Sequence, residues 1–305
     1  MAGESVQMRA CEAALAALYL RGGENRQVVE RRRWLSLSRA LRRRSATLET
    51  VANCARQEGF AQEATILDSG RILDWALRLI ENGEALTALT PGYPDRWMKH
   101  LAHAAPPALW RIPGATTAAR AAEIKRASSV NSVAIVGSRR ISSSVRRFSK
   151  ELGHLCATSG LTLYSGNAVG CDEAAMRGTC EEGGKTIGIL PHGLNRIERV
   201  IPGAEYWSVC APDEEFSRAS AMERNALIYT SSPFSVIVHA RLREGGTWHG
   251  ALDAHRRKLT RLIARQDEKE PGNRALIALG AIPLIHSSGL LEAFDCKDAQ
   301  PFLFD

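Results

Sequence analysis

The sequence has no long apolar run, no closely spaced cysteine pair and no recognisable leader. No stretch approaches the ~20 consecutive apolar residues that a membrane-spanning helix needs. The opening residues, MAGESVQMRACEAA, lack the basic region and apolar core of a secretory signal. The seven cysteines are odd in number and scattered, with no C-x-x-C pair or zinc-type spacing, which is typical of reduced thiols. We therefore expect a soluble, cytoplasmic protein that does not contact membranes.

Acidic residues are in the minority. The 305 residues include 40 Lys and Arg against 33 Asp and Glu, a net charge of +7, and 45% are hydrophobic. The hydrophobic share is sufficient for a sizeable core. The basic excess favours a polyanionic partner, although ordinary surface solvation explains a modest excess equally well.

Helical periodicity dominates the first ninety residues. Apolar residues recur at helical spacing in segments 11–20, 31–43, 47–60 and 72–83. A connector containing Pro and Gly, residues 91–130, leads to an alternation of strands and helices over 131–305. The expected strands are 132–136, 161–164, 186–190, 235–239, 260–264 and 282–285. This order predicts an α/β fold: a doubly wound, mostly parallel Rossmann-like sheet preceded by a small helical domain, residues 1–90.

Three of the predicted strands run into small residues before a helix. The first ends in Gly137-Ser138-Arg139-Arg140, the second in Ser165-Gly166-Asn167, and the strand at 235–239 is followed by Gly245-Gly246-Thr247. Such turns place free backbone N–H groups and helix N-termini at one edge of a parallel sheet, where phosphates bind. We expect Arg224 and Asn225 to end a helix or loop near the same edge.

The predicted phosphate or DNA contacts come from these turns and from the segment before the fourth strand. They are Gly137, Ser138, Arg139, Arg140, Ser165, Gly166, Asn167, Arg224, Asn225, Gly245, Gly246 and Thr247. No catalytic residue, metal ligand or cofactor is predicted. Each arginine also has an ordinary structural interpretation, because the pair after the first strand could be a solvated loop and Arg224 could form a surface salt bridge with Glu223 or Glu215.

Other polar residues near the turns have less specific interpretations. Asp172 could be a helix cap, a metal ligand or a general base, and with no second carboxylate at ligand spacing we interpret it as structural or as orienting its loop. The spacing of His192, His239 and His249 fits no zinc site. The three-glycine G-x-G-x-x-G fingerprint is missing, as is an acidic residue about twenty residues further on, so NAD binding is not expected.

Residues 21–44 contain nine arginines and two glutamates. A run of this kind is usually a solvated helix face. Its density also fits a nucleic acid or another acidic partner, because each contacted phosphate releases counterions.

The ordered motifs resemble the DNA processing protein A family (DprA, also called Smf). The chain has Gly137-Ser138-Arg139, the segment SGNAVGCD at 165–172, Arg224-Asn225 and then Gly245-Gly246-Thr247, with Ala226 and Cys171 departing from the family pattern. The resemblance implies a Rossmann-type domain that binds single-stranded DNA without catalysis, in recombination, transformation or defence. It also implies a homodimer and a RecA-type recombinase as partner.

The sequence also leaves open two other classes of function. The first is a nucleotide-binding sensor or nucleotide phosphoribohydrolase related to the lysine-decarboxylase-like family, whose glycine turn is followed by a catalytic glutamate. Here Thr247 is followed by Trp248, His249 and Gly250, so that acid is missing. The second is a structural protein whose arginine-rich helices bind an acidic surface.

Overall fold

A computed structural model describes residues 2–20, 30–114 and 130–296 of the chain. The chain divides into two compact units. The first comprises Met1–Pro113, His192–Arg196 and Trp207–Glu215, and the second comprises Gly114–Pro191, Ile197–Tyr206 and Phe216–Asp305. No helix in the described part of the chain is long and apolar enough to cross a membrane.

The first unit is mainly helical. Its helices are α1 (Ala2–Tyr19), α2 (Trp34–Arg43), α3 (Val51–Gln57), α4 (Ala61–Leu67), α5 (Gly70–Glu81) and α6 (Asp95–Leu101). The apolar faces of α1 to α5 share one core, to which α1 contributes a run of buried small and leucine side chains, in keeping with the apolar periodicity of the sequence. Strand β1 (Ala85–Thr87) pairs antiparallel with β2 (Ala108–Ile112).

An aromatic cluster holds α6 in the first unit. Trp97 is fully buried, and its ring meets those of Tyr93 and Trp207 edge to face, at centroid distances of 5.3 Å and 5.7 Å. Tyr93 also donates a hydrogen bond to the carbonyl of Pro106. Part of the predicted connector, residues 91–130, is therefore packed structure, and residues 115–129 of it lie outside the described residues.

The second unit contains six parallel strands in the order β5-β4-β3-β7-β8-β9. They are β3 (Ser132–Gly137), β4 (Thr162–Ser165), β5 (Thr186–Leu190), β7 (Phe234–His239), β8 (Arg261–Arg265) and β9 (Ile282–Leu284). Strands β3, β5 and β7 are buried almost throughout, as expected of parallel strands covered on both faces. A further strand, β6 (Glu205–Ser208), has residues in both units.

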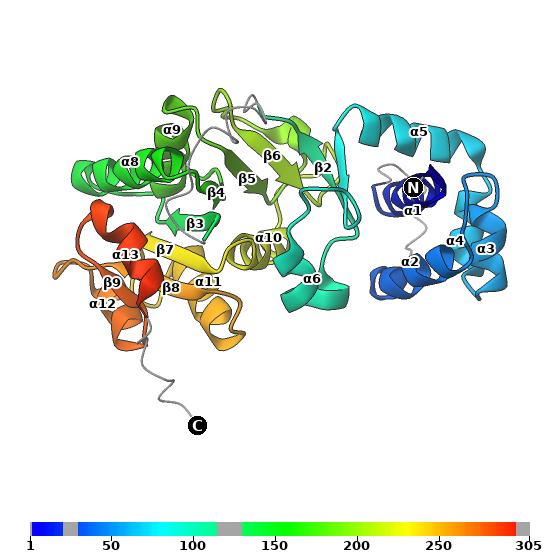
Figure 1. The fold of residues 1–305 in the computed structure, drawn as a ribbon. Coiled ribbons are helices and arrows are strands. Elements are labelled where there is room, and N and C mark those ends of the chain that lie inside the picture. The colour runs from blue at the N-terminus through cyan, green and yellow to red at the C-terminus, as the bar shows by residue number, and fades with distance from the viewer. Residues whose placement is uncertain (1, 21–29, 115–129, 297–305) are drawn as a thin grey trace. The chain divides into compact units, whose positions relative to one another are not determined.

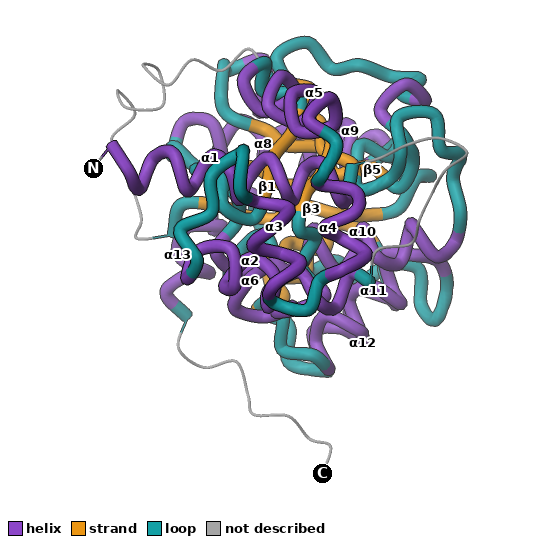
Figure 2. Tube along the Cα trace, turned by 90° about the vertical axis from the view of Figure 1, so that its right-hand side faces the viewer, coloured by secondary structure: helices purple, strands orange, loops and turns teal. Residues whose placement is uncertain are grey.

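Helices cover both faces of this parallel sheet (Figures 1 and 2). Helices α8 (Ser143–Thr158) and α9 (Cys171–Glu181) pack together on one face, and α10 (Arg218–Thr230) and α11 (Gly245–Arg256) on the other. Helices α12 (Pro271–Ala278) and α13 (Leu290–Asp295) follow β8 and β9 along the chain. The predicted doubly wound, mostly parallel α/β fold is confirmed.

The strand order reverses direction between β3 and β7. From β3 the chain proceeds to β4 and β5 on one side, whereas from β7 it proceeds to β8 and β9 on the other. Ligands of doubly wound folds bind at the carboxyl ends of the strands where the order reverses, because the two connections leave in opposite directions and expose both turns. The fold therefore predicts a ligand site at the turns after Gly137 and His239.

Candidate nucleic-acid interface

The turn after β3 is attached to the end of β7. The backbone N–H and the Oγ of Ser138 both donate to the carbonyl oxygen of His239, at 2.9 Å and 3.2 Å. Arg139 and Arg140 follow and are exposed. Helix α8 then begins after Ser142, whose side chain accepts a hydrogen bond from the backbone N–H of Val145. Both arginine side chains are thus presented to solvent beside a helix N-terminus.

The turn after β4 is more buried. The Oγ of Ser165 donates to the carbonyl of Ile135 at 2.6 Å, so this hydroxyl joins β4 to β3 and does not face solvent. Asn167 has a positive φ of 54°, and its Nδ2 donates to the carbonyl of Arg199. Gly170 has a φ of 102°, and a Cβ there would overlap the carbonyl oxygen of Ser138. The turns after β3 and β4 therefore touch through their backbones.

Helix α10 brings Arg224 to these turns from the other side of the sheet. We expected Arg224 and Asn225 to end a helix or loop, which is wrong: α10 runs unbroken from Arg218 to Thr230. The surface salt bridge considered for Arg224 is also wrong, because its side chain is buried, with 8% exposure. A Cβ on Gly166 would overlap the Nη1 of Arg224 and lie 2.7 Å from the Oδ2 of Asp172, so only glycine fits between these two charged groups.

Asp172 interacts with both turns. Its Oδ1 receives the backbone N–H of Gly137 at 3.0 Å, and the backbone N–H groups of Ala168 and Gly166 also favour its charged form. Asp172 is not the helix cap, because Gly170 holds the N-cap position of α9. Burial raises the pKa of Asp172 to about 6, although Arg224 and the three amides act in the opposite direction.

Burial has the corresponding effect on Arg224. It lowers the pKa of the guanidinium, while the Asp172 carboxylate raises it and Arg139 lowers it further. The Nε of Arg224 is buried without a hydrogen-bond partner among the described residues. Arg139 is thus close enough to Arg224 to affect it electrostatically, which places both arginines at the same edge.

The third glycine turn begins α11 beside α10. Gly245 and Gly246 are exposed, Thr247 is partly buried, and the hydroxyl of Tyr229 in α10 lies 3.4 Å from the Thr247 carbonyl oxygen. A Cβ on Gly246 would lie 3.8 Å from the Nδ2 of Asn225. Asn225 and the glycine turn therefore lie side by side, as the sequence predicted from separate motifs.

Sequence reasoning missed two polar groups that shape this edge. Asn273 is fully buried in α12, where its Oδ1 accepts from the N–H of Ala240 and its Nδ2 lies within 3.3 Å of the carbonyl oxygens of Ile237, Val238 and Arg265. Glu270 lies 2.8 Å from the Nε2 of His239. The lone asparagine shortly after Pro271 could have indicated the role of Asn273. Nothing in the local sequence indicated the contact between Glu270 and His239.

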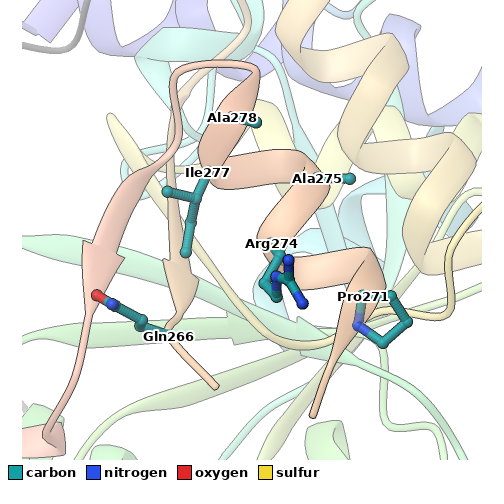
Figure 3. Close-up of a pocket in the computed structure, with 6 residues that line it drawn as sticks. All are labelled: Gln266, Pro271, Arg274, Ala275, Ile277 and Ala278. Carbon is teal, nitrogen blue, oxygen red and sulfur yellow. The ribbon is translucent and has the colours of Figure 1, made fainter. Parts of the chain in front are cut away.

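The described residues contain no cluster of three or more His, Cys, Asp or Glu side chains that could hold a metal ion. A groove of about 600 Å³ lies elsewhere in the second unit, lined by Gln266 and one side of α12 (Figure 3). Its lining includes Pro271, Arg274 and Ile277 but none of the predicted contact residues.

The arginine-rich segment lies in the first unit, where part of its charge is neutralised. Arg43 and Arg44 both pair with Glu58, and Arg33 lies 3.8 Å from Glu63. Arg32 and Arg39 are exposed, with no ion pair to the described residues. The segment's first two arginines, at 21 and 26, lie outside the described residues.

Comparison with known proteins identifies the family. DNA processing protein A of Streptococcus pneumoniae superposes with a TM-score of 0.62 at 17% identity, over 97% of this chain and 99% of that one. A DNA processing protein A of Helicobacter pylori, described for its single-stranded DNA binding mode, gives a TM-score of 0.52 at 21% identity, over 62% and 87%. No curated protein matches the sequence. The structural likenesses show the fold alone, but the sequence itself matches the DNA recombination-mediator protein A family over residues 84–295, and the chain belongs to that family.

Proposed function

We propose that this chain binds single-stranded DNA at the carboxyl edge of its parallel sheet and acts in DNA processing without catalysis. Family membership supports the DNA partner, and the Helicobacter pylori relative is described as binding single-stranded DNA. The observation that carries the proposal is the position of Arg139 and Arg140, exposed at the strand-order reversal beside the start of α8. Positively charged side chains beside the free N–H groups of a helix N-terminus can bind the phosphates of a nucleic acid backbone.

The twelve predicted residues divide into two groups in this proposal. Those with exposed or partly exposed positions make the DNA contacts: Ser138, Arg139, Arg140, Asn167, Asn225, Gly245, Gly246 and Thr247. The buried ones, Gly137, Ser165, Gly166 and Arg224, shape the edge from beneath. A single strand bound there would be held mainly by its backbone, and its affinity would therefore depend strongly on salt.

Fluorescence anisotropy with a labelled oligonucleotide tests the proposal. We expect the single strand to bind more tightly than the matching duplex, with affinity falling steeply between two salt concentrations. Equal affinity for the two forms, or a flat response to salt, contradicts it.

We also propose the finer assignments that family membership suggests: transformation or defence as possible settings, a cytoplasmic location, self-association into a homodimer and a RecA-type recombinase as partner. Light scattering is expected to give the mass of a dimer, and a monomer at all concentrations contradicts that assignment. The recombinase assignment predicts that this chain accelerates the loading of a RecA-type recombinase onto single-stranded DNA, and no acceleration contradicts it.

A further inference from the structure

The carboxylate of Asp172 lies where a bound anion would be expected. It is buried, with 4% exposure, and its Oδ1 accepts the backbone N–H of Gly137 from the turn after β3, while the backbone N–H groups of Gly166 and Ala168 in the turn after β4 favour its charged form. Converging amides of this kind form an anion-binding concavity. Because an internal carboxylate occupies the concavity, these amides are not available to DNA.

Arg224 completes the arrangement from α10. Its guanidinium and the Asp172 carboxylate both border the space above Gly166, where no side chain fits. A buried carboxylate is costly unless hydrogen bonds and an opposite charge compensate it, and here the amides and Arg224 offset part of the cost of burial. Asp172 thereby links the turn after β3, the turn after β4 and helix α10, which come from three separate parts of the sequence.

We infer that Asp172 is the positioning residue of the DNA site: its carboxylate replaces an anion, fixes the two turns and Arg224, and leaves phosphate to bind outside it through Arg139 and Arg140. This inference rests on the proposed function. It also predicts that Gly137 and Gly166 do not touch DNA, although the sequence placed them among the contacts.

Several titratable and charged groups lie around Asp172, and the pH controls whether its carboxyl is charged. Arg224 and Tyr229 face it from α10, Cys171 is its neighbour in α9, and the pKa of both Tyr229 and Cys171 is raised by burial and additionally by the Asp172 charge. The pKa of Asp172 itself is raised to about 6. Because this pKa is raised by burial, acidification through that range protonates Asp172 and favours the arrangement in which the side chain is buried.

The test compares Asp172→Asn with Glu173→Gln, which removes the same charge from the next residue of α9. Glu173 pairs with Arg177 and belongs to neither turn. The readout is the ratio of single-strand to duplex affinity at fixed salt, because general charge effects alter both affinities alike. We expect the ratio to fall about threefold or more in Asp172→Asn, a free-energy change of ~0.7 kcal/mol or more, and to stay unchanged in Glu173→Gln.

The pH profile separates positioning from mere folding. In the wild type and in Glu173→Gln the ratio should rise as the pH drops through about 6, because protonation favours the arrangement in which the pKa of Asp172 is raised, whereas in Asp172→Asn it should stay low and flat. Since all three proteins contain the same histidines, the difference reports Asp172 alone. An Asp172→Asn variant with the wild-type ratio and pH profile overturns the inference.

Amide hydrogen exchange tests the same inference without DNA. We expect faster exchange at Gly137, Gly166 and Ala168 in Asp172→Asn at pH 7.5. In the wild type we expect slower exchange at pH 5 than at pH 7.5, after correction for the intrinsic pH dependence of exchange, because protonation of Asp172 favours the arrangement in which it is buried. The wild-type comparison remains informative if the variant does not fold. Unchanged protection of these amides overturns the inference, whereas a failure of the wild type to bind single strands overturns only the proposed function.

Discussion

Ser138 and His239 are joined by two hydrogen bonds, from the N–H and the Oγ of the serine to the carbonyl oxygen of the histidine. This link fixes the end of β3 to the end of β7, where the strand order reverses. It leaves the next two residues, Arg139 and Arg140, exposed beside the start of α8. A fixed turn that carries exposed charges suits the recognition of a backbone whose phosphates repeat at regular intervals.

Replacement of Arg139 tests this turn directly. We expect Arg139→Ala to weaken single-strand binding by about 1–3 kcal/mol, as for loss of a charge-assisted hydrogen bond. Anisotropy titrations at one salt concentration measure the change.

The matched control for Arg139 is Arg257→Ala. Arg257 is an exposed arginine that caps the C-terminal end of α11, about 18 Å along the helix from Gly245. The Arg257→Ala substitution also removes one positive charge, but at the end of α11 away from the glycine turn. It should leave the affinity for single-stranded DNA nearly unchanged. Equal losses in both variants would indicate general charge attraction and not a site at the sheet edge.

Gly166 provides a second test, of the packing beneath the site. In Gly166→Ala the added Cβ would overlap Arg224 and approach Asp172, and overpacking of this kind typically costs ~1–3 kcal/mol of unfolding free energy. We expect lower stability in chemical denaturation together with weaker DNA binding. Gly289→Ala is the control, since its Cβ would make only an ordinary contact with Leu284, and a Gly166→Ala protein as stable as this control would contradict the described packing.

The parallel strands were predictable because each is a short, nearly continuous apolar run bounded by turn residues. Strand β3, with the sequence SVAIVG, is buried along its whole length. Strands β1 and β6 were missed for the converse reason: ALT and EYWS are short and have no apolar pattern that distinguishes them from loop. Their pairing depends on partners distant in sequence.

The local part of the site was predictable, and the buried part was not. Glycine turns after strands are visible in the sequence, so the edge bearing Arg139 and Gly245 could be expected. The burial of Arg224 could not, because arginine is rarely buried unless an opposite charge compensates it, and the compensating charge, Asp172, is 52 residues away in sequence. Asp172 itself resembles an ordinary helix cap until the turn after β3 is placed against it.

Glu58 predicts an acid-sensitive contribution to stability. Hydrogen bonds from Arg44 and the nearby Arg43 charge lower the pKa of Glu58 in the folded protein. A lowered folded-state pKa stabilises the protein above the ordinary carboxyl range, and this stabilisation is lost as the pH falls through the folded-state pKa. We expect Glu58→Gln to lower the melting temperature at pH 7, with the difference from wild type shrinking below the ordinary carboxyl pKa and vanishing once the pH is below the lowered folded-state pKa.

The control for Glu58 is Glu49→Gln. Glu49 is exposed and has no ion pair to the described residues, so its replacement should change the melting temperature little at any pH. A Glu58→Gln difference that persists unchanged in acid would mean that the side chain acts through packing and not through its charge.

The proposal that the chain acts without catalysis is testable with nucleoside monophosphates. No acidic residue follows Thr247 at the start of α11, where Trp248 is buried and His249 is exposed. Without an acid there to assist ribosyl cleavage, incubation with or without magnesium should release no free base. Chromatography of the mixture measures this. Enzyme-dependent base release that disappears in Thr247→Ala would place the protein among the hydrolases.

The last prediction concerns the arginines of the first unit. Arg32 and Arg39 are exposed, seven residues apart, and unpaired with the described residues, so any nucleic acid they contact is recognised by charge alone. The double variant Arg32→Glu, Arg39→Glu should weaken the binding of single strands and of duplex by the same factor. It should also reduce the salt dependence of binding, while the preference for single strands stays the same. The double variant Arg71→Glu, Arg78→Glu is the matched control: it has the same spacing, the same charge change and exposed positions on α5. Circular dichroism first establishes that both are folded. If the Arg32 and Arg39 variant abolishes single-strand preference while Arg139→Ala leaves binding intact, the specific site belongs to the first unit and not to the sheet edge.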